Sequence, residues 1–522
     1  MLARRPLTCV LLLAAAFHLV GMVFNPLPAQ DGLKFIRFAR QFQSLPWADV
    51  VRGADQHPLY PASIALVQPV IAIGTGPNHH SWRIAAQAVS SIASIALLVP
   101  LFLLVREWFD QRTAALSALL FVLLPVPGDL GHDTLSDPLA LLGFTTAFWL
   151  GVRALKSGRL TEALGCGIAS GLGFLARPEV ALLPVVVGLL AFVRWFLNRP
   201  TIPGSALGNN INIPALLLCF LTIVGTYALI KGDVSEKLAL QHATGLGSGP
   251  KLVRTTPIWL PKGLDDPRWD FSPKEEWDHP QGLSATSAGL RLARRWSEGL
   301  AWGLVPFVVW GAWRSWKGSL SDGIAIAYVI VFSAVLVRHA MGLGYLSSRH
   351  TLSLLIITIP WAASGILLVG DRLSTRLGGN QKTLRQLSFG ALAASVVLSA
   401  MIQCKPGHPS RWGHLQAGHW LAEHARSNEA VLDTRGWAAF VSGRNSFDYW
   451  HVRQALTDPT LAYVVVTDAE LKAPTPRAET LRAVLDHSST LAVTYPERRE
   501  GRGAGVLVYR FQPPESWEEL LP

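Results

Sequence analysis

The chain has 522 residues, of which 50% are hydrophobic and only 16% are charged, and its mean hydropathy is +0.31. This charged share lies well below the quarter that is usual for soluble domains, so the composition predicts an integral membrane protein. The net charge is +11, but the basic residues recur between apolar runs instead of forming a basic arm, which argues against nucleic-acid binding. The four cysteines form no CxxC pair or disulfide framework, so zinc or redox chemistry is not expected.

Apolar segments near the length of a transmembrane helix recur along the chain. We predict about eleven of them, at 7–24, 83–105, 113–127, 137–155, 160–176, 179–197, 212–231, 299–316, 322–340, 350–370 and 386–403. The segment 61–74 is apolar but too short to cross, which favours a juxtamembrane or re-entrant helix. The apolar residues of 33–43 recur at helical spacing, which predicts an interfacial helix at the level of the lipid headgroups. Such a helix would serve simply to anchor the chain at the membrane surface.

The basic residues predict how the chain is oriented in the cell membrane. With the N-terminus cytoplasmic, every inner connection is basic: Arg4/Arg5, Arg106/Arg112, Arg153/Lys156/Arg159, Arg194/Arg199, Arg314/Lys317 and Arg372/Arg376/Lys382/Arg385. The outer segments are then 25–82, 128–136, 177–178, 232–298, 341–349 and 404–522. Residues 1–29 would alternatively be a cleaved signal peptide. Leu27 is too large for the −3 position of a cleavage site, so we expect an uncleaved first helix.

The outer loop 232–298 is rich in tryptophan, with Trp259, Trp269, Trp277 and Trp296. These rings either belong to an interfacial aromatic belt or stack on sugar faces.

The tail, 404–522, is expected to form a small soluble α/β domain outside the membrane. A helix is predicted at 413–425, and Val- and Tyr-rich strands at 462–468, 489–495 and 504–511. This domain would bind acceptor or glycan, or only stabilise the outer face. Its histidines are expected on the surface rather than at a metal: His408, His414, His419 and His424.

Four groups of charged residues fall on the predicted outer side. They are Asp31; Asp129, Asp133 and Asp137; Arg177 and Glu179; and Arg338, His339, Tyr345, Arg349 and His350. Singly, each has an ordinary explanation: Asp129 and Asp133 as solvated turn residues, Asp137 as a helix cap, and the arginines as interfacial flanks. Together they are more informative, because charge at membrane depth is costly and marks functional sites.

Carboxylates and arginines on one face predict transfer from a lipid-phosphate sugar donor. Guanidinium groups bind the oxygens of a departing phosphate bidentately. An aspartate can orient an acceptor hydroxyl or amide and take its proton. The chain has neither a P-loop nor a glycine-rich dinucleotide fingerprint followed by a suitable acid, so no soluble nucleotide-sugar site is expected.

Several motifs resemble those of GT-C fold glycosyltransferases, especially glycosyltransferase family 39, which includes protein O-mannosyltransferases and lipid A aminoarabinose transferases. "QDGLKFIRFA…HPLYPASIAL" (30–65) is similar to the family's first outer loop, with its acid, aromatic and "PPLYP"-like element. "LSDPLALLGFTTAFWL" (135–150) resembles the second acidic loop, and "GLGFLARPEVALL" (171–183) the "LTRPEG"-type element. "SSRHTLSLLIITIP" (347–360) resembles the "RYLLPLLP" helix start, so the matches follow family order within residues 1–403.

The resemblance implies an α-helical polytopic membrane domain of GT-C type over 1–403, followed by the α/β domain. It also implies roles for single residues. Asp31 would be the catalytic acid–base residue and Asp137 the second acid, with Asp133 as the alternative. Arg349 would match the motif arginine, and its binding to the lipid phosphate is a hypothesis. The full set expected to bind the donor is Arg349, Arg177, His350, Tyr60 and Lys34.

The chain departs from the family pattern at three places. Gln30 and Gly32 flank Asp31 where the family often has two adjacent acids, His350 stands where others carry tyrosine, and "PPLYP" retains one proline. Some GT-C enzymes require a divalent cation and others do not. A single carboxylate at Asp31 is a thin ligand set, so the metal requirement stays open.

We therefore expect an inverting, polyprenyl-phosphate-sugar-dependent glycosyltransferase with a glycan, lipid or protein acceptor on the extracytoplasmic face. The donor's tail would lie among the spans and the membrane lipids. One alternative is a transporter or flippase, which should show an internal repeat and ionisable residues near mid-bilayer. Another is a non-catalytic membrane scaffold, in which Asp31 would be dispensable.

Overall fold

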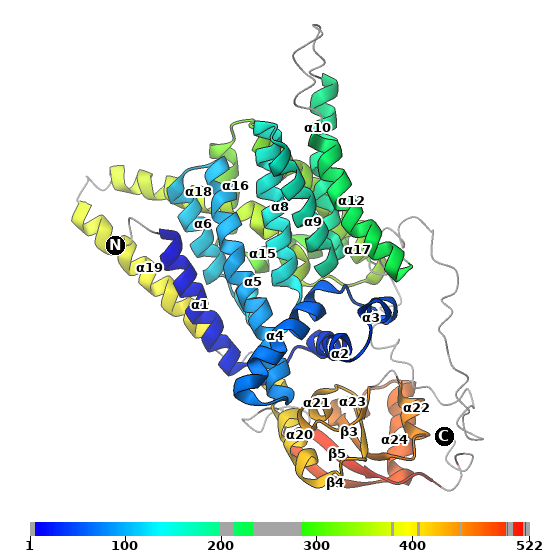
Figure 1. Ribbon diagram of the computed structural model, residues 1–522. Helices are drawn as coiled ribbons and strands as arrows, with labels where there is room; N and C mark the ends of the chain where they lie inside the picture. The colour runs from blue at the N-terminus through cyan, green and yellow to red at the C-terminus, as the bar shows by residue number, and fades with distance from the viewer. Residues whose placement is uncertain are drawn as a thin grey trace.

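The computed structural model describes residues 6–197, 212–232, 283–376, 381–403, 408–448, 451–496, 498, 505–514 and 517. Several residues singled out above lie outside these ranges: Arg4, Arg5, Arg199, Trp259, Trp269 and Trp277. Figure 1 shows a bundle of long helices above a smaller domain that contains a sheet, with short helices between the two parts.

The amphipathic helix α15 (Ala285–Gly299) packs with a bundle of apolar helices. These are α1 (Pro6–Phe24), α5 (His79–Trp108), α6 (Gln111–Leu123), α7 (Pro125–Gly131), α8 (Asp137–Ser157), α9 (Leu160–Ala176), α10 (Leu182–Leu197), α12 (Asn212–Lys231), α16 (Val305–Ser315), α17 (Leu320–Leu343), α18 (Leu352–Arg376) and α19 (Gln381–Gln403). Within the described ranges, α1, α5, α8, α12, α17 and α18 are long and apolar enough to cross a membrane. The polytopic architecture is therefore confirmed. The spans predicted at 160–176, 179–197 and 386–403 fall on α9, α10 and α19, where the apolar stretches are shorter.

Two predicted spans are interrupted. Over 113–127, α6 ends at Leu123, and α7 leaves at an angle of 68° because Leu124 is extended and Pro125 starts a new helix. The span predicted at 299–316 contains only the shorter helix α16, because α15 ends at Gly299. Between them, Ala301 and Trp302 have left-handed backbones, with φ of 50° and 58°, and such residues cannot continue a right-handed helix.

Small residues allow the bundle helices to pack closely. A Cβ added at Gly143 of α8 would lie 2.7 Å from the Cα of Gly173 in α9, and one at Gly365 of α18 would meet the backbone of Phe307 in α16. Close backbone approach at small residues is the usual way helices associate in lipid. The largest fully buried side chains between them are aromatic, among them Phe144, Phe148 and Tyr328.

Three helices form a layer between the bundle and the sheet domain: α2 (Gln30–Ser44), α3 (Trp47–Gly53) and α4 (Leu59–Thr75) (Figure 1). The amphipathic helix predicted at 33–43 is α2. It buries Phe35, Ile36, Phe38 and Ala39 on one face. The apolar stretch predicted at 61–74 lies within α4, whose Tyr60 packs edge-on against Phe35 at 5.0 Å between ring centroids.

The C-terminal region contains helices and a five-stranded sheet. After the short helix η3 (Pro409–Arg411) come α20 (Trp412–His424), β1 (Ala430–Asp433), α21 (Trp437–Ser442), β2 (Ser446–Phe447), α22 (Val452–Leu456), β3 (Leu461–Thr467), α23 (Asp468–Leu471), α24 (Pro476–Ser488), β4 (Ser489–Pro496) and β5 (Gly505–Phe511). The strand order is β2-β1-β3-β5-β4, with β1 parallel to β2 and β3, and β5 antiparallel to β3 and β4.

The helix and the three strands predicted in the tail coincide with α20, β3, β4 and β5. The sequence analysis did not predict β1 or β2. β1 is only four residues long and is buried on both faces, so it shows no polar–apolar alternation.

Candidate active site

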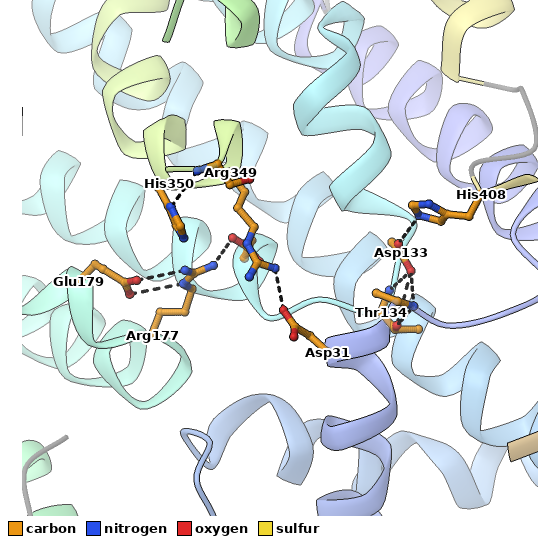
Figure 2. A network of polar contacts seen from close by, with 11 residues as sticks. Asp31, Asp133, Thr134, Arg177, Glu179, Arg349, His350 and His408 are labelled. Atoms are coloured by element: carbon orange, nitrogen blue, oxygen red, sulfur yellow. Dashed lines mark hydrogen bonds and ion pairs between the residues drawn. The ribbon is translucent and has the colours of Figure 1, made fainter. Parts of the chain in front are cut away.

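The candidate active site contains an ion pair between Asp31 and Arg349. Asp31 lies in the first turn of α2, and Arg349 lies in η2 (Ser348–Thr351), the short 3-10 helix before α18. Nη1 of Arg349 donates to Oδ2 of Asp31 at 2.8 Å (Figure 2). The Asp31 side chain is 46% exposed, so solvent and other molecules can reach this carboxylate.

Arg177 holds two further carboxylates beside this pair. It follows α9 with an extended backbone, because Pro178 disfavours a helical conformation at the residue before it. Its Nη1 contacts Oδ1 of Asp137, the first residue of α8, while Nη2 and Nε contact the two oxygens of Glu179 at 3.0 and 3.3 Å. Burial works against the charge of Arg177, but Asp137 and Glu179 outweigh it and raise the pKa of the guanidinium.

His350 lies next to Arg349 and points toward Arg177 and Glu179 in Figure 2. Its Nδ1 accepts a hydrogen bond from the backbone N–H of Ser347 at 3.2 Å, which fixes the ring at the start of η2. The rings of His339 and Tyr345 lie 5.4 and 6.0 Å from it. All four sequence groups are therefore represented at one place, by Asp31, by Asp137, by Arg177 with Glu179, and by Arg349 with His350.

Asp133 lies outside this network and is bound on all sides. Its Oδ1 accepts from the backbone N–H groups of Ala29 and Thr134 at 3.0 and 2.7 Å, and its Oδ2 contacts Nε2 of His408 at 3.1 Å. Burial raises the pKa of Asp133, but the hydrogen bond with His408 and the charge of Arg411 lower it further than burial raises it. The side chain is 6% exposed, so this carboxylate is ionised but shielded.

Tyr60 and Lys34 were also expected to bind the donor. Tyr60 is completely buried, and its hydroxyl bonds to the carbonyl oxygen of Ala86 at 3.0 Å and to Oγ of Ser90 at 2.8 Å, which ties α4 to α5. The structure does not bring this hydroxyl to the Asp31–Arg349 pair. Lys34 lies about one helical turn after Asp31 on α2 and is half-buried.

The residues around the segment that leads to Asp31 were not anticipated from the sequence. Thr134, His408, Arg411 and Trp437 all contact this segment or Asp133. The tail histidines were expected on the surface. The side chain of His408 is 42% exposed but pairs with Asp133, and His414 is buried, so for His414 the prediction was wrong. No local pattern marks these residues, because their contacts join segments far apart in the sequence.

The site residues do not form a metal site. Within the part of the chain that the structure describes, no group of three His, Cys, Asp or Glu side chains is placed to hold a metal ion. Asp31 and Asp137 each contact a guanidinium instead. A divalent cation such as Mg²⁺ or Ca²⁺ requires several oxygen ligands converging on one point, so the donor set does not fit one, and we assign no step to a metal.

Comparisons with known proteins show which proteins the chain resembles. The family model described as dolichyl-phosphate-mannose-protein mannosyltransferase matches residues 56–203. An undecaprenyl phosphate-alpha-4-amino-4-deoxy-L-arabinose arabinosyl transferase from Enterobacter sp. (strain 638) is 30% identical over 126 residues, which are 23% of each chain. Its counterpart from Erwinia tasmaniensis is 32% identical over 126 residues, 23% of this chain and 22% of the relative. The matches thus span under a quarter of these relatives.

Solved structures extend the similarity to nearly the whole chain. ArnT from Cupriavidus metallidurans bound to undecaprenyl phosphate has a TM-score of 0.58 at 13% identity, covering 98% of this chain and 99% of that chain. The oligosaccharyltransferase AglB from Archaeoglobus fulgidus, in complex with an inhibitory peptide and a dolichol-phosphate, has a TM-score of 0.51 at 13% identity, covering 99% and 75%. The chain therefore has the GT-C fold.

Proposed function

We propose that this protein is an inverting glycosyltransferase that moves a sugar from a polyprenyl-phosphate donor to an acceptor. Asp31 is the base that deprotonates this acceptor. The observation that carries the proposal is the Asp31–Arg349 pair, set in a GT-C bundle beside the Arg177–Asp137–Glu179 cluster. It places an accessible carboxylate next to a guanidinium, as deprotonation of an acceptor and binding of a phosphate require.

In the proposed reaction, Asp31 accepts the proton of the acceptor hydroxyl or amide as the acceptor attacks the anomeric carbon. The new bond forms on the face opposite the phosphate, and the bond from the anomeric carbon to the phosphate oxygen breaks. Polyprenyl phosphate leaves with the bonding electron pair, and the configuration inverts. A positioned general base contributes about 10²- to 10⁴-fold to such a step.

Arg349 is the better of the two arginines for the leaving phosphate. It has one carboxylate partner in the network and its side chain is 30% exposed. Arg177 is 20% exposed and already pairs with Asp137 and Glu179. We therefore assign phosphate binding to Arg349, together with its neighbour His350 and with Lys34, which follows Asp31 on α2. To Arg177 we assign the positioning of Asp137, the proposed second acid.

The proposed topology follows from the charge pattern of the loops. Residues 1–403 form the membrane domain with the N-terminus in the cytoplasm of the inner or plasma membrane, and 404–522 form the extracytoplasmic α/β domain. The active site then opens toward the outer leaflet. Undecaprenyl and dolichyl phosphates accompany the two solved structures above, which supports a polyprenyl phosphate as the carrier here.

The test uses the full-length protein in lipid vesicles with radiolabelled polyprenyl-phosphate sugars and a panel of lipid, glycan and peptide acceptors. We expect labelled product with the wild type and none with Asp31→Asn. Asp49→Asn is the matched control, because Asp49 lies on the adjacent helix α3 in an exposed pair with Arg52. Turnover that persists in a correctly folded Asp31→Asn protein would refute the proposed role of Asp31, whereas a wild type without turnover would favour a scaffold or transporter.

A further inference from the structure

The linker between α1 and α2, residues 25–29, is held by the C-terminal domain. Arg411 donates from Nη1 to the carbonyl oxygens of Leu27 and Pro28 at 3.2 and 2.8 Å. Nε1 of Trp437 donates to the Pro28 carbonyl at 2.9 Å. The Arg411 guanidinium lies 5.0 Å from the centroid of the Trp437 ring. Only 9% of Arg411 is exposed and Trp437 is half-buried, so these two side chains pack together against the linker.

The loop before α8 holds the same linker through its next residue. The backbone N–H of Ala29 donates to Oδ1 of Asp133 at 3.0 Å and to Oγ1 of Thr134 at 2.9 Å. The other oxygen of Asp133 contacts His408, which comes from the C-terminal region. Figure 2 shows Asp133, Thr134 and His408 grouped to the right of Asp31, apart from Arg349 on the left.

These contacts act directly on the position of Asp31. Ala29 is the N-cap residue of α2, it makes no side-chain capping bond, and Asp31 follows two residues later. The first turn of α2 also lies against Thr134, since a Cβ added at Gly32 would overlap Oγ1 of that residue. Displacing a reacting group by about 1 Å can lower the rate about 100-fold. The contacts that hold residues 27–29 therefore affect the rate of transfer through the position of Asp31.

We propose that Arg411 and Trp437 of the C-terminal domain, together with Asp133, are positioning residues that fix Asp31 for the transfer reaction. The inference rests on the proposed role of Asp31 as the base. The C-terminal domain is then a structural part of the active site. This positioning role of Asp133 replaces the expectation that Asp133 is an alternative catalytic acid, because both of its oxygens are already bound and its side chain is 6% exposed.

Other contacts between α2 and the C-terminal domain are more peripheral. Arg37 pairs with Asp448 at 3.3 Å, but its side chain is 50% exposed. Exposed ion pairs contribute little because water screens them and both side chains lose freedom. Arg40 lies over Phe440 at 5.6 Å from the ring centroid. These contacts orient the helix, whereas the bonds of Arg411 and Trp437 reach the backbone at its start.

The experiment compares Arg411→Ala, Arg411→Lys and Trp437→Phe with the wild type in vesicles. Two quantities are measured: kcat and donor KM for transfer, and amide hydrogen exchange of a peptide covering residues 25–33. For Arg411→Ala we expect kcat to fall about 10- to 100-fold with little change in KM, and exchange in this peptide to accelerate. Arg411→Lys should restore part of kcat. Trp437→Phe keeps the ring and should have a smaller effect of the same kind.

Arg510→Ala is the control, because Arg510 pairs with Glu429 within the C-terminal domain and does not touch the linker. It should leave both quantities near the wild-type values. Unchanged exchange of 25–33 in Arg411→Ala and Trp437→Phe would overturn the proposal, as would faster exchange with an unchanged kcat. If the wild type transfers no sugar, the proposed function fails and the catalytic meaning of the linker contacts fails with it. The exchange data would then still report whether the domain restrains the linker.

Discussion

Arg349 donates a hydrogen bond to Asp31 although 318 residues separate the two in the chain. Both residues follow segments whose backbone carbonyls are held by buried or half-buried arginines. Arg411 binds the carbonyls of Leu27 and Pro28 before Asp31, and Arg295 of α15 binds the carbonyl of Leu346 at 3.0 Å before Arg349. The pair is thus positioned from both sides by residues that have no chemical role in the proposed transfer.

Replacing Arg349 tests its proposed contact with the phosphate. Arg349→Ala should lower kcat/KM for the donor about 100- to 1,000-fold, as loss of a donor to developing negative charge does in other enzymes. Arg349→Lys keeps the charge but loses the planar fork, so an intermediate loss is expected. Steady-state kinetics with labelled donor measure both variants.

Arg52→Ala is the matched control for Arg349, because Arg52 lies on α3 in an exposed pair with Asp49. It should change kcat/KM little. If Arg349→Ala kept the wild-type kcat/KM, Arg349 would not bind the leaving phosphate.

Removing Arg177 should destabilise the protein. Arg177→Met leaves Asp137, whose side chain is 4% exposed, without its cation. Removing one partner of a buried ion pair typically lowers the free energy of unfolding by about 3–5 kcal/mol. Because Arg177 is partly exposed, we expect a loss of about 3 kcal/mol. Unfolding in detergent, followed by tryptophan fluorescence, measures the change.

The neutralised triple variant Arg177→Met, Asp137→Asn, Glu179→Gln distinguishes charge from packing. It should recover much of the stability, because no carboxylate is left unpaired, while transfer remains impaired. Equal stability of the wild type and Arg177→Met would show that the buried carboxylates do not depend on this arginine.

Gly32→Ala should impair transfer although alanine is the better helix former by about 1 kcal/mol. The added Cβ overlaps Thr134 and would push the first turn of α2, with Asp31, away from the loop before α8. We expect kcat to fall at least about tenfold. Gly53→Ala, at the end of α3, is the control, since a Cβ there meets nothing within 4 Å.

A second substitution tests the cause of this loss. Thr134→Ala removes Oγ1, the nearest atom that Gly32→Ala would strike, while Asp133 still accepts from Ala29. The double variant should be more active than Gly32→Ala alone. If it is no better, the overlap with Oγ1 of Thr134 is not the reason for the loss.

The stability contributed by Asp133 should depend on pH. Its pKa is lower in the folded protein than the unfolded value of about 3.9, so the folded state favours the carboxylate. The stabilisation is therefore full above the unfolded pKa and is lost as the pH falls through the folded pKa. The difference in unfolding free energy between the wild type and Asp133→Asn should shrink in this acidic range. A difference that is independent of pH would contradict the assignment.

Two of the three departures from the family pattern have a physical explanation in the structure. Gly32 stands where a second acid is common, and here the first turn of α2 is so close to Thr134 that a side chain would not fit. His350 accepts a hydrogen bond from Ser347 and so orders the turn that carries Arg349. The single proline of the "PPLYP"-like element has no structural explanation in these contacts.

The apolar runs, their basic flanks and the Val-rich strands could be read locally, because membrane thickness and sheet burial impose lengths and periodicities on a segment by itself. The polytopic bundle, α2, β3, β4 and β5 were predictable on that basis. The breaks before α7 and α16 were harder to predict from the sequence. Ala301 and Trp302 have no local reason to be left-handed, and since both are exposed, nothing in the packing explains their backbone conformation.

The sequence by itself determined that charged side chains recur beside membrane helices, and its motif order indicated which of them belong together. Only the tertiary structure decided that Asp31 faces Arg349 while Asp133 turns away to hold Ala29. The reason is that hydrogen bonds and ion pairs act over about 3 Å and their partners here lie far apart in the chain. No local pattern records such distances, so Arg411 and Trp437 gained a role only once the fold was known.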